Sequence, residues 1–165
     1  MKNYTKIMKK FDNSNYIVRT FDFESLSKFG SYPDKMKELY EQGYSQVIIN
    51  SKIMLSILER VLDHKDLEFV SFEVSDPSLD EETRTQMNKI IENIKNKKMS
   101  FCDVKEYLFW VFDEGSIFID KLMLYHYEKN VNIEVYSNGL LYFDIDDKEE
   151  FIELVIAILE RYLNE

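Results

Sequence analysis

Residues 131–145 read VNIEVYSNGLLYFDI and carry the clearest fold signal in the chain. Apolar and polar residues alternate on both sides of Asn138-Gly139, as they do in strands with one buried face. Asn-Gly favours the positive φ angles of a type I′ turn, so the stretch predicts a β-hairpin that turns at these two residues. A broad apolar stripe from Phe151 to Tyr162 then predicts an amphipathic helix that begins near Asp147 and closes the domain.

The segment before the hairpin predicts a third strand and a pair of helices. Residues 117–127 are typical of a strand, which makes 117–145 an antiparallel three-strand meander. The run YLFWVF at 107–112 fits a helix or a strand, and the cap signal Ser100-x-x-Asp103 favours a helix over 101–113. A further helix is predicted over 78–97, with Asp76 or Ser78 as its cap.

The first half of the chain reads as strands alternating with helices. Residues 15–21, 46–50 and 67–75 have the composition of strands, and helices are predicted between them, near 34–42 and 51–63. A β-α-β-α-β order with short connections favours parallel pairing. We therefore expect a single α+β domain over residues 1–165 with a mixed sheet, in which this parallel half precedes the helical pair, the meander and the last helix. Residues 1–12 contain four lysines and are a candidate for a flexible basic arm.

Composition limits the function classes. The chain has 165 residues, 45% of them hydrophobic, and a net charge of −10, which argues against a phosphate-binding surface and hence against nucleic acid. It contains no apolar run near the roughly 18–20 residues that span a bilayer, and its start lacks the apolar stretch of a signal peptide. Cys102 is the only cysteine, which rules out an intramolecular disulfide. We expect a cytoplasmic protein that does not enter membranes.

The residues needed for most enzyme chemistries are scarce. No glycine-rich phosphate loop follows a predicted strand, and the chain has only four glycines. A nucleophilic Cys102 would need His64 or His126, the only two histidines, and a small buried cysteine is the commoner outcome. The sequence therefore favours a protein that is not an enzyme and has no cofactor.

Acidic residues at the end of the hairpin suggest a binding surface instead. Capping and the helix dipole account for Asp147 and Glu150, whereas Asp144 and Asp146 project from a strand without such a role. An acidic surface suits a basic partner protein, so we expect an accessory protein such as an immunity-type or phage-defence inhibitor. The candidate contact residues are Glu134, Asp144, Asp146, Asp147 and Glu150. The apolar face of the last helix is broad enough to be buried on two sides, within the domain or in a homodimer.

The alternative is a Mg²⁺-dependent phosphoesterase or nuclease. If the first three strands were parallel, Asp22, Glu24 and Asp76 would follow strand ends at one edge of the sheet. Carboxylates gathered there could hold Mg²⁺ for phosphoryl chemistry. This hypothesis depends on the parallel arrangement.

Overall fold

The fold comes from a computed structural model that describes residues 3–24, 26, 30–74, 76, 79–114, 118–143 and 148–165. The strands are β1 (Asn3–Asp12), β2 (Asn15–Phe23), β3 (Ser45–Gln46), β4 (Leu67–Glu73), β5 (Lys121–His126), β6 (Val131–Tyr136) and β7 (Leu140–Phe143). The helices are α1 (Tyr32–Glu41), α2 (Ser51–Leu62), α3 (Glu81–Lys95), α4 (Phe101–Phe109) and α5 (Glu149–Asn164), and a π-helical turn at Trp110–Glu114 extends α4. No described helix is both long enough and apolar enough to span a membrane.

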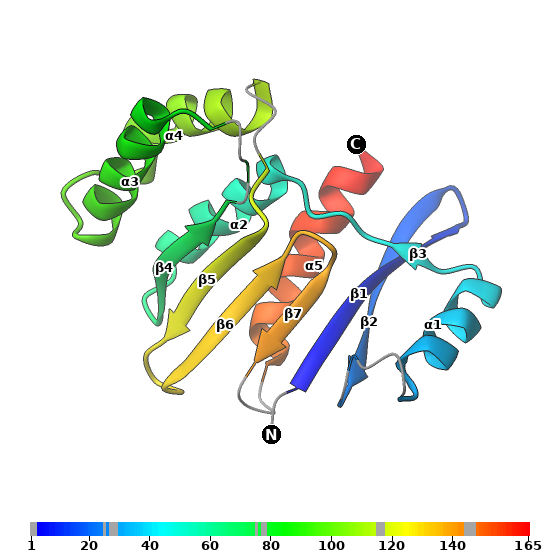
Figure 1. The fold of residues 1–165 in the computed structure, drawn as a ribbon. Coiled ribbons are helices and arrows are strands. Elements are labelled where there is room, and N and C mark those ends of the chain that lie inside the picture. Colours follow the sequence, from blue (N-terminus) through cyan, green and yellow to red (C-terminus); the bar gives the residue numbers. More distant parts are fainter. Residues whose placement is uncertain are drawn as a thin grey trace.

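The strands form one sheet in the order β2-β1-β7-β6-β5-β4, and every described pair is antiparallel. The short β3 adds to β1 where β7 stops pairing with it. Helices α2 and α5 lie together behind the sheet in Figure 1, and the main apolar core fills the space between them and the strands. Helix α1 packs on the opposite face, over β1 and β2, where Met36 and Leu39 meet Met8 and Phe23.

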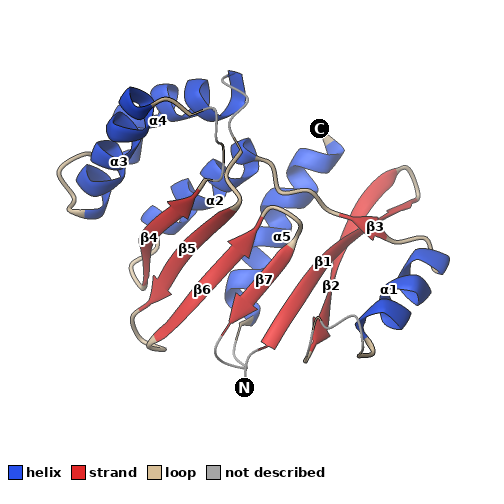
Figure 2. Ribbon diagram, viewed as in Figure 1, coloured by secondary structure: helices blue, strands red, loops and turns tan. Residues whose placement is uncertain are grey.

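The antiparallel sheet corrects the expected parallel N-terminal half. Residues 3–12, the candidate flexible arm, form the long strand β1, which lies between β2 and β7 (Figure 2). The type I′ turn that joins β1 to β2 is made by Asn13 and Ser14, whose φ angles are 47° and 71°. A two-residue turn can only produce an antiparallel pair, and β3 is too short to be the middle strand of a parallel crossover. The β-α-β-α-β prediction was therefore wrong.

The predicted meander is present, but its turn has a different geometry. Strands β5, β6 and β7 pair antiparallel in sequence order. At the turn only Gly139 has a positive φ, +82°, and its N–H donates to the Tyr136 carbonyl at 3.1 Å. This is the pattern of a type I turn followed by a left-handed residue, and not the type I′ turn expected from Asn138-Gly139.

Side-chain caps mark the starts of α3 and α4, but the residue that caps α3 is not the one expected from the sequence. The capping box of Ser100 and Asp103 is present, so the ambiguous aromatic run belongs to a helix and its π-helical extension. Asp80 caps α3 by accepting from the Thr83 N–H at 2.8 Å, a role expected of Asp76 or Ser78. Ser78 itself lies outside the described residues.

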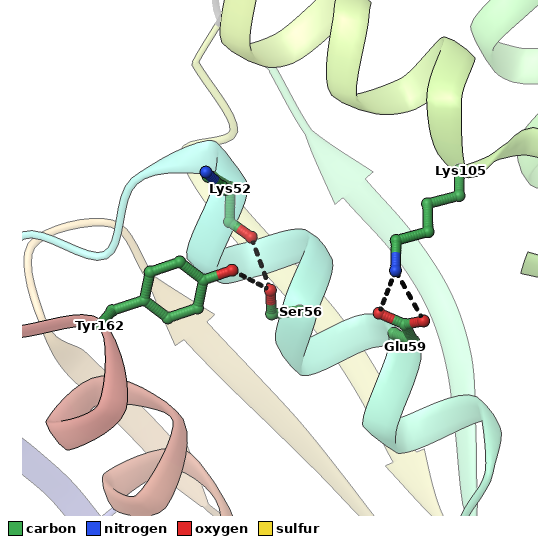
Figure 3. Close-up of polar contacts among 5 residues, drawn as sticks. All are labelled: Lys52, Ser56, Glu59, Lys105 and Tyr162. Atoms are coloured by element: carbon green, nitrogen blue, oxygen red, sulfur yellow. Dashed lines mark hydrogen bonds and ion pairs between the residues drawn. The ribbon is translucent and has the colours of Figure 1, made fainter. Parts of the chain in front are cut away.

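Polar contacts join the helices of the core layer to one another. Figure 3 shows Lys105 of α4 donating to both carboxylate oxygens of Glu59 on α2, at 3.0 and 3.2 Å. In the same view the hydroxyls of Ser56 and Tyr162 form a 2.8 Å hydrogen bond between α2 and α5. The buried residues of α5 are Phe151, Ile152, Val155, Ile158 and Leu159. The sheet and α2 cover them, so burial within the chain accounts for the broad apolar face of this helix.

Candidate functional site

Of the five predicted partner-binding residues, the structure describes Glu134 and Glu150, and it places them on opposite sides of the sheet. Asp144, Asp146 and Asp147 lie outside the described residues. Glu134 points from β6 to the face of the sheet opposite α5, because its strand neighbours Ile133 and Val135 fill the core under the helices. Glu150 is in the first turn of α5 on the helix side, where it bonds His64. No single surface therefore contains both glutamates.

The structure does not bring the alternative metal ligands together either. Asp22 and Glu24 belong to the β2 edge of the sheet, whereas Asp76 follows β4 at the opposite edge. Five strand spacings separate these edges, roughly 24 Å at the usual distance between strands. Within the described ranges, no group of three or more His, Cys, Asp or Glu residues is placed to hold a metal ion. The geometric premise of the alternative Mg²⁺ site is therefore missing.

Asp22 has a structural role at the β2 edge. Its carboxylate accepts from the Thr5 hydroxyl at 2.7 Å and from the Lys148 ammonium at 2.5 Å. Partial burial raises the pKa of Asp22, but the hydrogen bonds from Lys148 and Thr5 outweigh this effect and hold the pKa below its ordinary value. Through this carboxylate, Lys148, the residue before α5, is bonded to the edge strand β2.

Among the described residues, neither histidine forms a hydrogen bond with Cys102. Cys102 is exposed on α4. The Nδ1 atom of His64 accepts from the Asp66 N–H at 3.2 Å, and its Nε2 atom lies 3.1 Å from Glu150 Oε1. Both ring nitrogens of His64 are therefore engaged elsewhere, and His126 lies on the helix-facing side of β5. A base for the thiol, which nucleophilic catalysis would need, is absent from these contacts.

The sheet face opposite α2 and α5 is the most distinctive surface of the described chain. No described helix covers it along β4, β5 and β6 (Figures 1 and 2). We call this surface the open face. Its side chains form three cross-strand rows: Glu73, Lys121 and Tyr136; Ser71, Met123 and Glu134; and Glu68, Tyr125 and Asn132. Three carboxylates against one ammonium give the open face a net charge of −2.

Hydrogen bonds fix two of these carboxylates around Lys121. Its ammonium lies 2.9 Å from Glu73 Oε2 and 3.7 Å from Glu134 Oε1. The hydrogen bond to Glu73 raises the pKa of Lys121, against the opposing effect of burial. The phenol of Tyr136 donates to Glu134, and burial together with that carboxylate raises the pKa of Tyr136 well above its ordinary range. Both glutamates are thus held in place with free acceptor capacity towards solvent.

The third carboxylate is held by an aromatic pair. Tyr127, which follows β5 and is 56% exposed, donates its phenolic proton to Glu68. Its ring stands perpendicular to that of Tyr125, with 5.3 Å between the ring centres. Tyr125 in turn donates to the side-chain oxygen of Asn130. Aromatic faces and fixed carboxylates at this corner are suited to contacts with Lys and Arg side chains.

Sequence reasoning found only Glu134 on this surface. Glu68 and Glu73 were assigned to a strand inside a parallel sheet, where no open face exists. The alternation in KLMLYH at 121–126 and VNIEVY at 131–136 could have identified the tyrosines as one face. Comparisons with protein family models, with curated proteins and with solved structures find no match to this chain. The function is therefore argued from the geometry of the open face.

Proposed function

We propose that this protein is a binding protein whose open face engages a basic surface of another protein. The observation that carries this proposal is the placement of Glu68, Glu73 and Glu134 together on a sheet face that no described helix covers. The partner is basic because the face carries a net charge of −2 and the whole chain −10. Opposite charges across an interface speed association and select the partner.

Aromatic side chains supply the contact area that charge alone does not. Tyrosine and methionine are enriched at protein interfaces, and the face offers Tyr125, Tyr127, Tyr136 and Met123 between its carboxylates. Hydrogen bonds to Glu68 and Glu134 already restrict Tyr127 and Tyr136, so less conformational entropy is lost on binding. An inhibitor that neutralises a basic enzyme, as in immunity or phage defence, would use such a surface.

The test is a comparison of two triple variants with equal change in charge. The face variant carries Glu68→Gln, Glu73→Gln and Glu134→Gln. The control carries Glu149→Gln, Glu153→Gln and Glu165→Gln, three exposed positions at α5 and the chain end. Tagged wild type and both variants are used to capture partners from extracts of the source organism, after far-UV circular dichroism has verified that each is folded.

We expect a stoichiometric basic protein with wild type and with the control. The face variant should associate about tenfold more slowly at low salt, and the difference should shrink as salt screens the charges. Equal binding by the face variant would contradict the proposal. A further variant with Asp144→Asn and Asp146→Asn tests the acidic residues that the sequence analysis placed at the end of the hairpin. If this hairpin-end variant loses the partner while the face variant keeps it, the open face is not the binding surface.

A further inference from the structure

A cavity of about 310 Å³ lies on the helix side of the sheet, away from the open face. Its walls come from the first turns of α5, from the β5–β7 meander and from the loop between α2 and β4. Apolar atoms form most of its lining, and Leu67, Ile133, Phe143 and Leu154 are among the residues that supply them. The volume is at the lower end of the range for small-molecule sites, which are mostly apolar with a few polar groups that orient the ligand.

His126 supplies such a polar group. It is only 7% exposed and lines the cavity. Its Nδ1 atom accepts a long hydrogen bond, 3.5 Å, from the backbone N–H of Lys129, which leaves Nε2 as the ring nitrogen that carries a hydrogen. No described side-chain nitrogen or oxygen is both sealed from solvent and unpaired. The Nε2–H of His126 has no acceptor among the described residues, so it opens onto the cavity.

Three neighbouring polar groups of the lining, His64, Glu150 and Lys148, already have hydrogen-bond partners. The ring of His64 lies 6.5 Å from that of His126, and its Nε2–H donates to Glu150. This hydrogen bond lowers the pKa of Glu150 and keeps it a carboxylate. Lys148, which also lines the cavity, donates to Thr5 and Asp22. Compared with His64 and Lys148, the imidazole of His126 keeps a donor that a ligand in the cavity could satisfy.

We propose that this cavity binds a small molecule with an apolar tail and one carbonyl or carboxylate oxygen, which accepts a hydrogen bond from His126 Nε2. The tail occupies the space between Ile133, Phe143 and Leu154. Because this N–H faces the cavity and is not sealed off, an acceptor atom of the ligand would replace solvent as its hydrogen-bond partner. The proposal is independent of the open face, since the two lie on opposite sides of the sheet.

The test uses three probes that share one tail: 4-phenylbutyrate, 4-phenylbutyramide and 4-phenylbutylamine. The first two present an acceptor oxygen and the third presents only donors. We expect saturable binding of the carboxylate and the amide by isothermal titration calorimetry, with dissociation constants of about 1 mM or tighter, and at least tenfold weaker binding of the amine. NMR spectra should show the His126 imidazole signals moving with the first two probes. The comparison of carboxylate with amide distinguishes an acid ligand from a neutral one.

Two variants separate the hydrogen bond from the cavity. His126→Phe keeps a ring in the wall but removes the N–H, and it should weaken both carbonyl probes about tenfold while leaving the amine unchanged. Leu154→Trp fills the cavity and should abolish binding of all three probes, with the fold verified by NMR. The proposal is overturned if no probe binds, if the amine binds as tightly as the amide, or if His126→Phe binds the amide as well as wild type does.

Discussion

The ammonium of Lys148, the residue before α5, bonds the Asp22 carboxylate of the edge strand β2 at 2.5 Å, although 126 positions separate them in the sequence. Lys148 also donates to the Thr5 hydroxyl at 2.7 Å, and Thr5 donates to Asp22. Lys148 is 12% exposed and Asp22 67% exposed. The three side chains fix the start of the last helix to the β1–β2 hairpin.

Removal of this contact should destabilise the fold in a pH-dependent way. Asp22→Asn should lower the free energy of unfolding at pH 7 by about 0.5–1 kcal/mol, a modest value because the carboxylate is mostly exposed. The folded-state pKa of Asp22 lies below 3.8, so its contribution is present above that pH and is lost as the pH falls through the folded-state value. Urea unfolding at pH 7, 4 and 3 should show less acid sensitivity for Asp22→Asn than for wild type. Glu24→Gln serves as the control, because it removes a nearby exposed carboxylate and leaves the contact between Lys148 and Asp22 in place.

Glycine should be favoured in both hairpin turns, because each turn holds a residue with a positive φ angle. Gly139→Ala should destabilise by about 2 kcal/mol or more, because Gly139 has φ +82° and an added Cβ would approach the Val47 carbonyl oxygen to 2.9 Å. Ser14→Gly should stabilise by about 0.5–1 kcal/mol, because Ser14 has φ 71° in a type I′ turn. Thermal unfolding of both variants measures whether each substitution stabilises or destabilises the fold. A stabilised Gly139→Ala variant would show that the β6–β7 turn is not packed against β1 and the loop at Val47.

The buried amine of Lys6 should make stability rise with pH in alkaline solution. Lys6 is 2% exposed, and its ammonium bonds the Asn138 carbonyl and, at 3.4 Å, Gln46 Oε1. Burial lowers its folded-state pKa below 10.5, so the unfolded chain holds more protons as the pH approaches 10.5. Wild type should therefore gain stability relative to Lys6→Met between pH 7 and 10, as measured by urea midpoints. Lys9→Met is the control, because it removes a lysine of the same strand that is partly exposed and not buried.

The phenol of Tyr136 should lose its proton at a higher pH than an ordinary tyrosine does. Burial, the hydrogen bond to Glu134 and the charge of that carboxylate all raise its pKa above 10.0. Glu134→Gln should bring the pKa down, because the amide carries no charge and bonds the phenol more weakly. Carbon-13 labelling at the tyrosine ring allows the titration to be followed by NMR. Glu73→Gln, which removes a more distant carboxylate, should have the smaller effect. Equal shifts from the two variants would disprove the Tyr136–Glu134 hydrogen bond.

Local sequence signals were sufficient for the elements whose partners are sequence neighbours. The meander was predictable because each strand pairs with the next one along the chain and the alternation of Val131, Ile133 and Val135 fixes the buried face. Capping was predictable at Ser100, where a reciprocal pair of hydrogen bonds needs only four consecutive residues. Sequence analysis identified only Glu134 of the open face. Which residues share this face depends on which strands lie side by side, and that is decided by the tertiary structure.

The sequence by itself determined the alternation along β5, β6 and β7, the stripe of α5 and the acidic excess, since these depend only on residue type and spacing. Only the tertiary structure decided that β1 lies between β2 and β7, despite the four lysines at 1–12. The reason is that strand order is set by which apolar surfaces can be buried together: Ile7 and Met8 fill the cores on opposite faces of the sheet, and no local pattern encodes that. The same long-range packing brings Lys148 to Asp22 and His64 to His126.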